Sequence, residues 1–436
     1  MKRSSLIYLI DGFRVLRKNG FKTILNPISS FREYTEVRRH KNTISFIRSL
    51  DYSTADLVKN TGLMTRFSNM KNIEVETINW FIPYFAHAYG GIYTILRFAD
   101  YFHAKKGIKN RLIIYGNSLA STTEIKNRIA KLFPNLLSEE IIILRDNNVN
   151  TLPQADICIA TLWTSAYLAL KFNKTKGKFY FIQDYEPLFY PAGAIYALAE
   201  ATYRFGFYGI TNTPGLYDIY VRDYNGIAEY FIPSVDNKTF YPSKRTPSKP
   251  TDENPFTIFF YARPDSPRNA FELGITALQK IKKKYGERVR IYTAGSRWNP
   301  RNYDLESDIT DLGVLSYEKT AFLYRKCDLG IVFMFTKHPS YLPSELMACG
   351  SVVLTNYNPA TTWFLKDGFN CLFTEPSVSC ICEKIEMLMQ NLNLRKQIIS
   401  NALNSIAKTS WENEIEKIYR FICNHEKVTG VTTFEM

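Results

Sequence analysis

Apolar stretches of strand length alternate with amphipathic stretches of helix length in two separate series along this chain. In the first series a strand is predicted at 75–82 and a helix at 92–104, and further strand–helix pairs follow to about residue 233. The second series runs from 256 to 409. Because strands that alternate with helices pair in parallel, each series predicts one doubly wound α/β domain. A chain of 436 residues is long enough for both domains.

Residues 237–255 separate the two series and are rich in Pro, Lys, Ser and Thr, as expected of a linker. The predicted division is a basic helical extension at 1–73, an N-terminal Rossmann-like domain at 74–240, a C-terminal Rossmann-like domain at 250–408, and a terminal segment at 409–436 with a helix over 412–425. In α/β sheets, ligands bind at the carboxyl ends of the strands. A cleft between the two domains is therefore the expected ligand site.

The first 70 residues are strongly basic. They carry 13 Lys or Arg and 5 Asp or Glu, so 13 − 5 = +8 of the net charge of +14 falls in this sixth of the chain. Apolar residues are interleaved with the basic ones, a pattern that suits an anionic membrane surface. The same charge could face a nucleic acid. A packed accessory helix with a solvated basic face explains the pattern equally well.

The sequence also bears on the cellular compartment. No apolar run approaches the roughly 18 residues of a membrane-spanning helix. Asp11 and Arg14 interrupt the apolar part of the N-terminus, so no signal peptide is predicted. The seven cysteines are odd in number, and only Cys380 and Cys382 lie close together. They are predicted to be reduced thiols of a cytosolic protein, without a disulfide framework or a zinc site.

Two glycines, Gly90 and Gly91, stand directly before the first predicted helix of the N-terminal domain. Glycines at a helix N-terminus let a phosphate or a sugar approach the backbone N–H groups. A tight turn accounts for the pair equally well. The surrounding residues form neither the GxGxxG dinucleotide fingerprint nor a Walker loop with its lysine.

The loop that opens the C-terminal domain, 261–269, contains Arg263 and Arg268. Pro264, Ser266 and Pro267 lie between the two arginines. Arginine offers a permanent charge and forked donors, so two arginines five residues apart suit a diphosphate. The alternative is an exposed loop with ordinary surface arginines. The prolines favour a fixed loop shape and thus a binding site.

The segment 183–187 in the N-terminal domain, QDYEP, follows a predicted strand and contains Asp184 and Glu186. The two carboxylates could bind a metal, hydrogen-bond sugar hydroxyls or belong to a structural turn. Sugar contact or a structural role is favoured over a metal. His87 and His338 lie in loops near the same strand ends, and no catalytic triad or HExxH motif is present. Aromatic residues near loops, which suit sugar binding but more often serve packing, are Trp80, Trp163, Tyr185, Tyr190, Trp298 and Tyr341.

The stretch 338–350, HPSYLPSELMACG, follows an apolar strand and places one carboxylate, Glu345, in the first turn of a short helix. A carboxylate at the carboxyl end of a parallel strand suits contact with a nucleotide. A solvated glutamate favoured by the helix dipole is an equally good reading of the spacing alone.

Taken together, these motifs resemble the two-domain GT-B-fold retaining glycosyltransferases. That family grips the donor diphosphate with an arginine at a strand end and a Lys or Arg five positions later, here Arg263 and Arg268. Its Glu-x7-Glu motif is similar to residues 337–345, where the second glutamate is Glu345 and Lys337 replaces the first. The phrases at 183–191, 199–213, 261–274 and 338–348 resemble a subgroup, the bacterial rhamnosyltransferases that build rhamnan chains, such as WsaF.

The resemblance implies an α/β fold of GT-B type, with two Rossmann-like domains facing across a cleft and a terminal helix that crosses back to the N-terminal domain. It implies transfer of L-rhamnose from dTDP-β-L-rhamnose, with retention of configuration and without a metal or cofactor, to a rhamnan or lipid-linked glycan. The alternatives are a retaining transferase with another nucleotide sugar, or a non-catalytic carbohydrate-binding partner. The expected location is cytoplasmic, with residues 1–70 able to contact the inner face of the plasma membrane, and no nucleic acid is expected as a partner.

The resemblance also implies roles for individual residues. Arg263, Arg268 and Glu345 would serve the transfer reaction. The donor would contact Gly90, Gly91, Arg263, Arg268, Leu315, His338, Ser340, Tyr341 and Glu345. The acceptor would contact His87, Asp184, Tyr185 and Glu186. Since Lys337 departs from the family pattern, the way the donor sugar is held is not transferable from the family.

Overall fold

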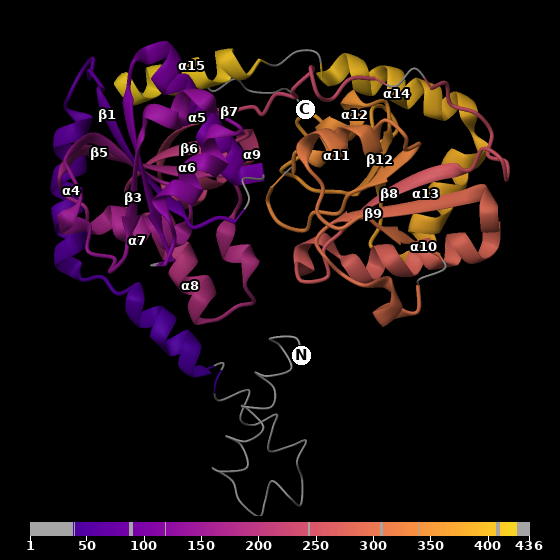
Figure 1. Cartoon of the computed structure of the whole chain (residues 1–436), viewed down its shortest axis with the longest axis horizontal. Helices are drawn as coiled ribbons and strands as arrows, with labels where there is room; N and C mark the ends of the chain where they lie inside the picture. Colours follow the sequence, from indigo (N-terminus) through magenta and orange to yellow (C-terminus); the bar gives the residue numbers. More distant parts are fainter. Residues whose placement is uncertain are drawn as a thin grey trace, which may run out of the picture. The chain divides into compact units, whose positions relative to one another are not determined.

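The computed structural model describes residues 38, 40–86, 90–117, 119–242, 245–305, 308–338, 340–406 and 410–424. The chain divides into two compact units, Met1–Asp56 and Leu57–Met436. In the first unit, residues 40–49 are helical and expose Ile44 and Phe46. The second unit contains two sheets and most of the helices (Figure 1). None of the described helices has the length and apolar character needed to cross a membrane.

Seven parallel strands form the sheet of the N-terminal lobe, in the order β3-β2-β1-β4-β5-β6-β7. The five inner strands are mostly apolar and almost fully buried, as expected of a parallel sheet that is covered on both faces, whereas the edge strands β3 and β7 are partly exposed. The strands are β1 (Thr77–Pro83), β2 (Lys109–Tyr115), β3 (Glu140–Leu144), β4 (Ala155–Ala160), β5 (Thr175–Ile182), β6 (Tyr208–Asn212) and β7 (Ile227–Phe231).

Helices cover both faces of this sheet. Apolar residues of α4, α5, α6 and α15 form one continuous core with β1, β2, β5 and β6, while α7 contacts β4 and β1. The helices are α4 (Thr54–Ser68), α5 (Gly90–Lys106), α6 (Thr122–Ala130), α7 (Trp163–Lys171), α8 (Ala194–Ala201), α9 (Pro214–Asp218) and α15 (Trp411–Cys423). A short 3-10 turn, η3 (Glu186–Phe189), follows β5.

The C-terminal lobe repeats this plan with six parallel strands in the order β10-β9-β8-β11-β12-β13. One core joins α10 and α13 to the sheet, and a second core joins α11, α12 and α14. The elements are β8 (Phe256–Ala262), η6 (Pro267–Asn269), α10 (Phe271–Tyr285), β9 (Val289–Gly295), β10 (Thr310–Asp311), α11 (Tyr317–Tyr324), β11 (Leu329–Ile331), α12 (Leu342–Ala348), β12 (Val352–Asn356), β13 (Leu372–Thr374), α13 (Val378–Gln390) and α14 (Leu392–Ile406).

The chain passes between the lobes twice, after β7 and between α14 and α15. After the second crossing, α15 packs on α5 and β7 of the N-terminal lobe. The Glu414 carboxylate accepts a hydrogen bond of 2.9 Å from the backbone N–H of Ile232. The Trp411 ring lies 6.2 Å from that of Phe231, measured between centroids. These contacts attach the last helix to the first crossing.

The predicted α/β fold class, two parallel sheets with a helical N-terminal part, is confirmed. One predicted strand, 311–315, is wrong in length, since β10 ends at Asp311. Beyond it, Leu312 donates to the Thr293 carbonyl and the Gly313 carbonyl accepts from the N–H of Gly295, so two hydrogen bonds to β9 continue past the strand. Gly313 has a φ of 63°, which is not strand geometry. The last helix ends at Cys423, and the predicted end at His425 lies outside the described residues.

The close approach of α4 to β5 provides a test of the packing. A Cβ added at Gly177 would lie 2.5 Å from the ring of Phe67, which is itself fully buried. We expect Gly177→Ala to lower the free energy of unfolding by about 1–3 kcal/mol, because overpacking forces the ring to move. Thermal or urea unfolding measures the change.

Gly62, on the same helix as Phe67, provides the matched control. A Cβ there would meet only the end of the Arg66 side chain, at 3.8 Å. Gly62→Ala should raise the free energy of unfolding by up to about 1 kcal/mol, because alanine favours the helix. Equal effects of the two substitutions would show that Phe67 does not pack against β5 as described.

Candidate functional site

Arg263 and Arg268 lie at the carboxyl end of β8, in the loop that leads to α10. The Arg263 guanidinium donates to the Tyr261 hydroxyl at 3.4 Å, and its central carbon lies 5.9 Å from the centre of that ring. Within the described part of the chain, neither arginine has a carboxylate within ion-pair distance. Their charges are close enough that Arg263 lowers the pKa of Arg268. Two adjacent, unpaired cations form a strong site for an anion.

Arg268 is held against the N-terminal lobe. Its guanidinium carbon lies 4.4 Å from the centre of the Phe189 ring in η3. The Nε atom is buried and has no hydrogen-bond partner among the described residues. Burial lowers the pKa of Arg268, while the negative charge of Asp184 opposes that shift. A buried donor without an acceptor is costly, so this group is ready to bind an anionic ligand.

Glu345 lies in α12 with a half-buried carboxyl group. Burial raises its pKa to about 8, and no cation counteracts the shift. Its neighbours include Tyr317, Tyr324 and Tyr341, whose pKa values its negative charge raises further. Across the described residues we find no hydrogen-bond or ion-pair partner for this carboxyl group. A partly open, unpartnered carboxyl group suits a ligand hydroxyl.

Gly90 and Gly91 begin α5 on the N-terminal side of the cleft. Gly90 has a φ of 43°, which favours glycine. A Cβ at Gly91 would lie 3.0 Å from the Gln183 amide nitrogen, which donates to the Gly91 carbonyl at 3.1 Å. Close packing at the end of β5 therefore explains the second glycine. The preceding residues, His87 included, lie outside the described residues.

Tyr341 connects the two lobes. Its hydroxyl accepts a hydrogen bond of 3.0 Å from the Asn212 amide at the end of β6, and it lies 3.0 Å from the Thr94 hydroxyl of α5. The ring of His338 lies 3.4 Å from the same amide, measured from Nε2. Through Tyr341, the loop before α12 is attached to the helix that starts at Gly90.

A local hydrogen bond joins two residues of that loop, His338 and Ser340. The backbone N–H of Ser340 donates to Nδ1 of His338 at 2.9 Å, so the neutral imidazole carries its proton on Nε2. Burial, and then the charge of Arg268, lowers the pKa of His338 to about 3, which keeps the ring neutral. Ser340 has a φ of 60°, in the left-handed region. Such strain persists where the surrounding contacts hold the chain.

Leu315 and Lys337 differ in their burial. Leu315 lies in the loop after β10 and packs partly buried against the α11–α12 core. Lys337 is exposed, and no acidic partner for it occurs within the described ranges. A third uncompensated cation thus stands next to His338, where the resembling family has a glutamate.

Asp184 is buried at the end of β5, only 8% exposed, and faces the C-terminal lobe. Its carboxylate accepts a hydrogen bond of 3.2 Å from the Thr336 hydroxyl and one of 2.8 Å from the N–H of Tyr185. Burial raises the pKa of Asp184 to about 6, although the charge of Arg268 lowers it in part. Asp184 therefore lies at the meeting point of the lobes, close to the arginine pair.

The other two residues of this motif point into the N-terminal lobe. The Glu186 carboxylate accepts hydrogen bonds from the N–H of Trp163 at 2.5 Å and from the Tyr180 hydroxyl at 2.8 Å. The Tyr185 hydroxyl lies 2.5 Å from that of Tyr224. Burial raises the pKa of Glu186 to about 8. These contacts favour a structural role for Glu186 in joining η3 to α7.

Several residues at the site were not singled out from the sequence: Thr94, Phe189, Asn212, Tyr317 and Thr336. Each is an ordinary polar or aromatic residue whose importance comes from a contact between the lobes. Only Asn212 carried a usable signal, as a polar residue at the carboxyl end of a buried strand. Within the described ranges, no group of three or more His, Cys, Asp or Glu could hold a metal ion.

The raised pKa of Glu345 predicts a pH-dependent stability. The folded protein binds a proton at this carboxyl group up to about pH 8, whereas the unfolded chain releases it near pH 4.5. The folded state thus holds more protons in this interval, and stability from this group falls as pH rises through it. We expect Glu345→Gln to melt at a higher temperature than wild type at pH 8.5, and at the same temperature near pH 4.5.

An exposed glutamate at a similar position of the neighbouring helix, Glu318 in α11, provides the control. Glu318→Gln should change the melting temperature by the same small amount at both pH values. If Glu345→Gln changes the melting temperature by the same amount at both pH values, the Glu345 carboxyl group does not have a raised pKa in the folded protein.

Comparison with known protein families identifies both lobes. Residues 72–211 match the family described as "WsaF, N-terminal domain", and residues 256–386 match "WsaF, C-terminal domain". The chain is 42% identical over 350 residues to the O-antigen biosynthesis protein RfbC of Myxococcus xanthus. That alignment covers 80% of this chain and 27% of RfbC, so the chain spans about a quarter of this curated relative.

Solved structures of low sequence identity share the fold. Sucrose-phosphate synthase of Thermosynechococcus elongatus superposes with a TM-score of 0.62 at 12% identity, covering 79% of this chain and 98% of its own. HepE of Anabaena, solved in complex with UDP and glucose, superposes with a TM-score of 0.61 at 14% identity. The superposition covers 80% of this chain and 99% of HepE. A mutant of TarM from S. aureus, solved with UDP and glycan ligands, superposes with a TM-score of 0.61 at 9% identity. The superposition covers 80% of this chain and 100% of the TarM chain. With both lobes matched in order and this architecture, the chain belongs to the WsaF family of GT-B-fold glycosyltransferases.

Proposed function

We propose that the protein transfers L-rhamnose from dTDP-β-L-rhamnose to a growing bacterial surface polysaccharide, with retention of configuration. One observation carries the proposal: within the described residues, Arg263, Arg268 and Glu345 have no ion-pair partner at one edge of the C-terminal sheet, although the charge of Asp184 acts on Arg268. This is the arrangement that a nucleoside diphosphate requires. HepE and TarM, which share the fold, were solved with UDP, and RfbC is named for O-antigen biosynthesis.

Each donor-site residue would serve a part of the nucleotide sugar. Arg263 and Arg268 would stabilise the negative charge that grows on the leaving diphosphate, where preorganised cations have their largest effect. Glu345 would hydrogen-bond a hydroxyl of the deoxyribose. The N-terminus of α5 at Gly90 and Gly91 would approach the diphosphate from the other lobe, and backbone groups near Leu315 would hold the base.

The loop 338–341 would close the donor site, because Tyr341 already joins it to both Thr94 and Asn212. The bond from the anomeric carbon to the phosphate oxygen breaks, and the acceptor oxygen attacks from the same face. The acceptor proton passes to the leaving phosphate, so no protein nucleophile is required. We expect neither a metal nor a cofactor, and activity in the presence of EDTA tests this.

The acceptor would lie on the N-terminal side, where Asp184 faces the arginine pair. His87 is kept as a proposed acceptor contact, whereas Tyr185 and Glu186 would act by holding the segment that carries Asp184. A rhamnan or lipid-linked glycan is the proposed acceptor. We place the reaction in the cytoplasm, with residues 1–70 able to contact anionic lipid and no role for nucleic acid. A deletion that ends before α4 spares the core of the N-terminal lobe. If such a deletion leaves binding to anionic vesicles unchanged, the extension is not an anchor.

Transfer from radiolabelled dTDP-rhamnose to a synthetic rhamnoside tests the proposed reaction. We expect turnover by the wild type and a loss of about 100- to 1,000-fold in kcat for Arg263→Ala, the effect of removing one stabilising donor from an anionic transition state. Arg222 provides the control, since this exposed arginine pairs only with Asp218 on its own helix turn. Arg222→Ala should retain wild-type activity.

Two other outcomes decide between the alternatives. Turnover of a UDP- or GDP-sugar without turnover of dTDP-rhamnose would overturn the rhamnose assignment and keep the transferase. Absence of turnover with every donor, in the wild type as in Arg263→Ala, would favour a non-catalytic carbohydrate-binding protein on the same fold.

A further inference from the structure

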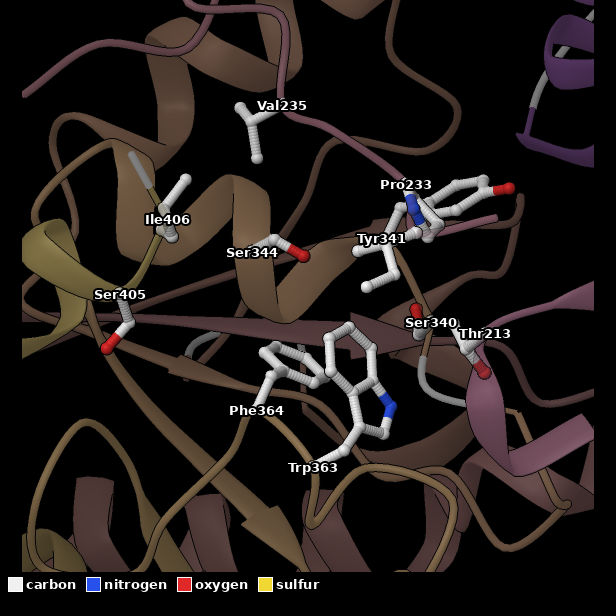
Figure 2. A pocket seen from close by; sticks show the side chains of 11 residues that line it. Thr213, Pro233, Val235, Ser340, Tyr341, Ser344, Trp363, Phe364, Ser405 and Ile406 are labelled. Carbon is white, nitrogen blue, oxygen red and sulfur yellow. The ribbon is translucent and has the colours of Figure 1, made fainter. Parts of the chain in front are cut away.

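A cavity of about 50 Å³ lies where the chain crosses between the lobes. Pro233 and Val235 of the first crossing line it, as do Ser405 and Ile406 at the end of α14, just before the second crossing (Figure 2). The remaining lining residues are Thr213 and Ile232 of the N-terminal lobe, Ser340, Tyr341 and Ser344 in or beside α12, and Trp363 and Phe364 after β12. The cavity therefore has walls from both lobes, from the first crossing and from the helix that carries Glu345.

This cavity is separate from the proposed nucleotide site. Ser344 lines it, whereas Glu345, the next residue of α12, does not. Successive residues of an α-helix point about 100° apart. Glu345 lies near Tyr317 and Tyr324 of α11, which pack on Phe240 further along the first crossing. The cavity and the Glu345 carboxyl group therefore lie on different sides of α12, and Ser340 and Tyr341 belong to both regions.

Two adjacent aromatic rings form one wall. The Trp363 and Phe364 rings are half-buried, and their centroids lie 4.6 Å apart. The indole N–H of Trp363 donates to the Ala360 carbonyl at 3.0 Å, which fixes the ring. Figure 2 shows both rings on one side of the cavity and Val235 and Pro233 on the other, with the Ser344 hydroxyl between them. Fixed aromatic faces beside hydroxyl groups suit the C–H faces and hydroxyls of a sugar.

Two hydroxyl groups of the lining have no partner within the described residues. Thr213 is fully buried, and its Oγ1 makes no hydrogen bond. Its backbone φ of 81° is unfavourable for a β-branched residue, so the surrounding contacts hold it in place. No hydrogen bond of the Ser344 side chain exists in the described part of the chain either. Oγ1 of Thr213 has almost no accessible surface, so of these two hydroxyl groups it is that of Ser344 that can meet a hydroxyl group of a ligand (Figure 2).

The lining also excludes other classes of ligand. None of the described residues that line the cavity is charged. A phosphate or carboxylate would therefore be desolvated there without a cation. By volume the cavity holds on the order of four water molecules, which matches one small ring rather than an extended chain.

We propose that this cavity is an accessory binding site for one uncharged sugar unit of the glycan that the enzyme extends. The proposal rests on the proposed function, since it names a second contact for the same acceptor class. Because its walls come from both lobes, an occupied cavity would favour the closed arrangement in which Tyr341 contacts Thr94 and Asn212. A long acceptor could occupy this site, whereas a monosaccharide acceptor could not occupy it together with the reaction centre.

The test compares a synthetic rhamnose tetrasaccharide with a monosaccharide rhamnoside, using the full-length chain. Trp363→Ala removes the stacking face, and Ser344→Leu fills the cavity. We expect each variant to bind the tetrasaccharide about tenfold more weakly by calorimetry without donor, equal to the loss of about 1.4 kcal/mol. The KM for the tetrasaccharide should rise by a similar factor at unchanged kcat, while transfer to the monosaccharide stays within about twofold of wild type.

Phe322 provides the matched control, an aromatic side chain that is 56% exposed on α11 and does not line the cavity. Phe322→Ala should bind and process both acceptors as wild type does. Melting temperatures and dTDP binding of all variants establish that the donor site remains folded.

Three results would overturn the proposal: wild type that does not bind the tetrasaccharide, variants that bind it as well as wild type, or equal losses with both acceptors together with a lower melting temperature. The last result would assign the cavity a structural role at the crossings only. Wild type that binds the tetrasaccharide in a Trp363-dependent way, without transfer from dTDP-rhamnose, would retain the sugar site and refute the proposed donor.

Discussion

Parallel pairing of every strand in both sheets is the constraint on which the rest of the structure depends. Parallel strands bring all their carboxyl ends to one edge, so residues far apart in the sequence meet there. Arg263 after β8, Glu345 after β11 and Asp184 after β5 reach the meeting region of the lobes for this reason. The helices pack on both faces of each sheet and so fix the position of these strand ends.

The lobes meet through hydrogen bonds and rings, while the charged groups at the edge are left without strong partners. Tyr341 bonds Thr94 and Asn212, and Tyr93 of α5 stacks on Tyr317 of α11 with ring centres 5.4 Å apart. Arg268 and Glu345, in contrast, lie in partly desolvated positions without a counter-ion among the described residues. Such groups reduce stability in the absence of ligand. A nucleoside diphosphate would bring an anionic phosphate to Arg268 and a sugar hydroxyl to Glu345, which connects their unfavourable environment to the proposed reaction.

The cavity at the crossings extends this relation between binding and closure. Its lining joins Pro233 and Val235 of one crossing to Ser405 and Ile406 beside the other, so a ligand there would contact parts that must move when the lobes open. The donor loop contributes Ser340 and Tyr341 to the same cavity. Acceptor length and donor-site closure would then depend on one another through Tyr341.

The sequence alone determined the fold class and both lobes, and it placed the two arginines and Glu345 near strand ends, because hydrophobic periodicity and the residues at strand ends are local signals. It could not determine the short β10, which ends at Asp311 before the left-handed Gly313. Nor could it show that Glu186 turns inward to Trp163, that Phe189 covers Arg268, or that Thr213 and Trp363 line one cavity. These are contacts between segments distant in the chain. Only the packing of the tertiary structure decides such contacts, since no local pattern records which side chains will meet.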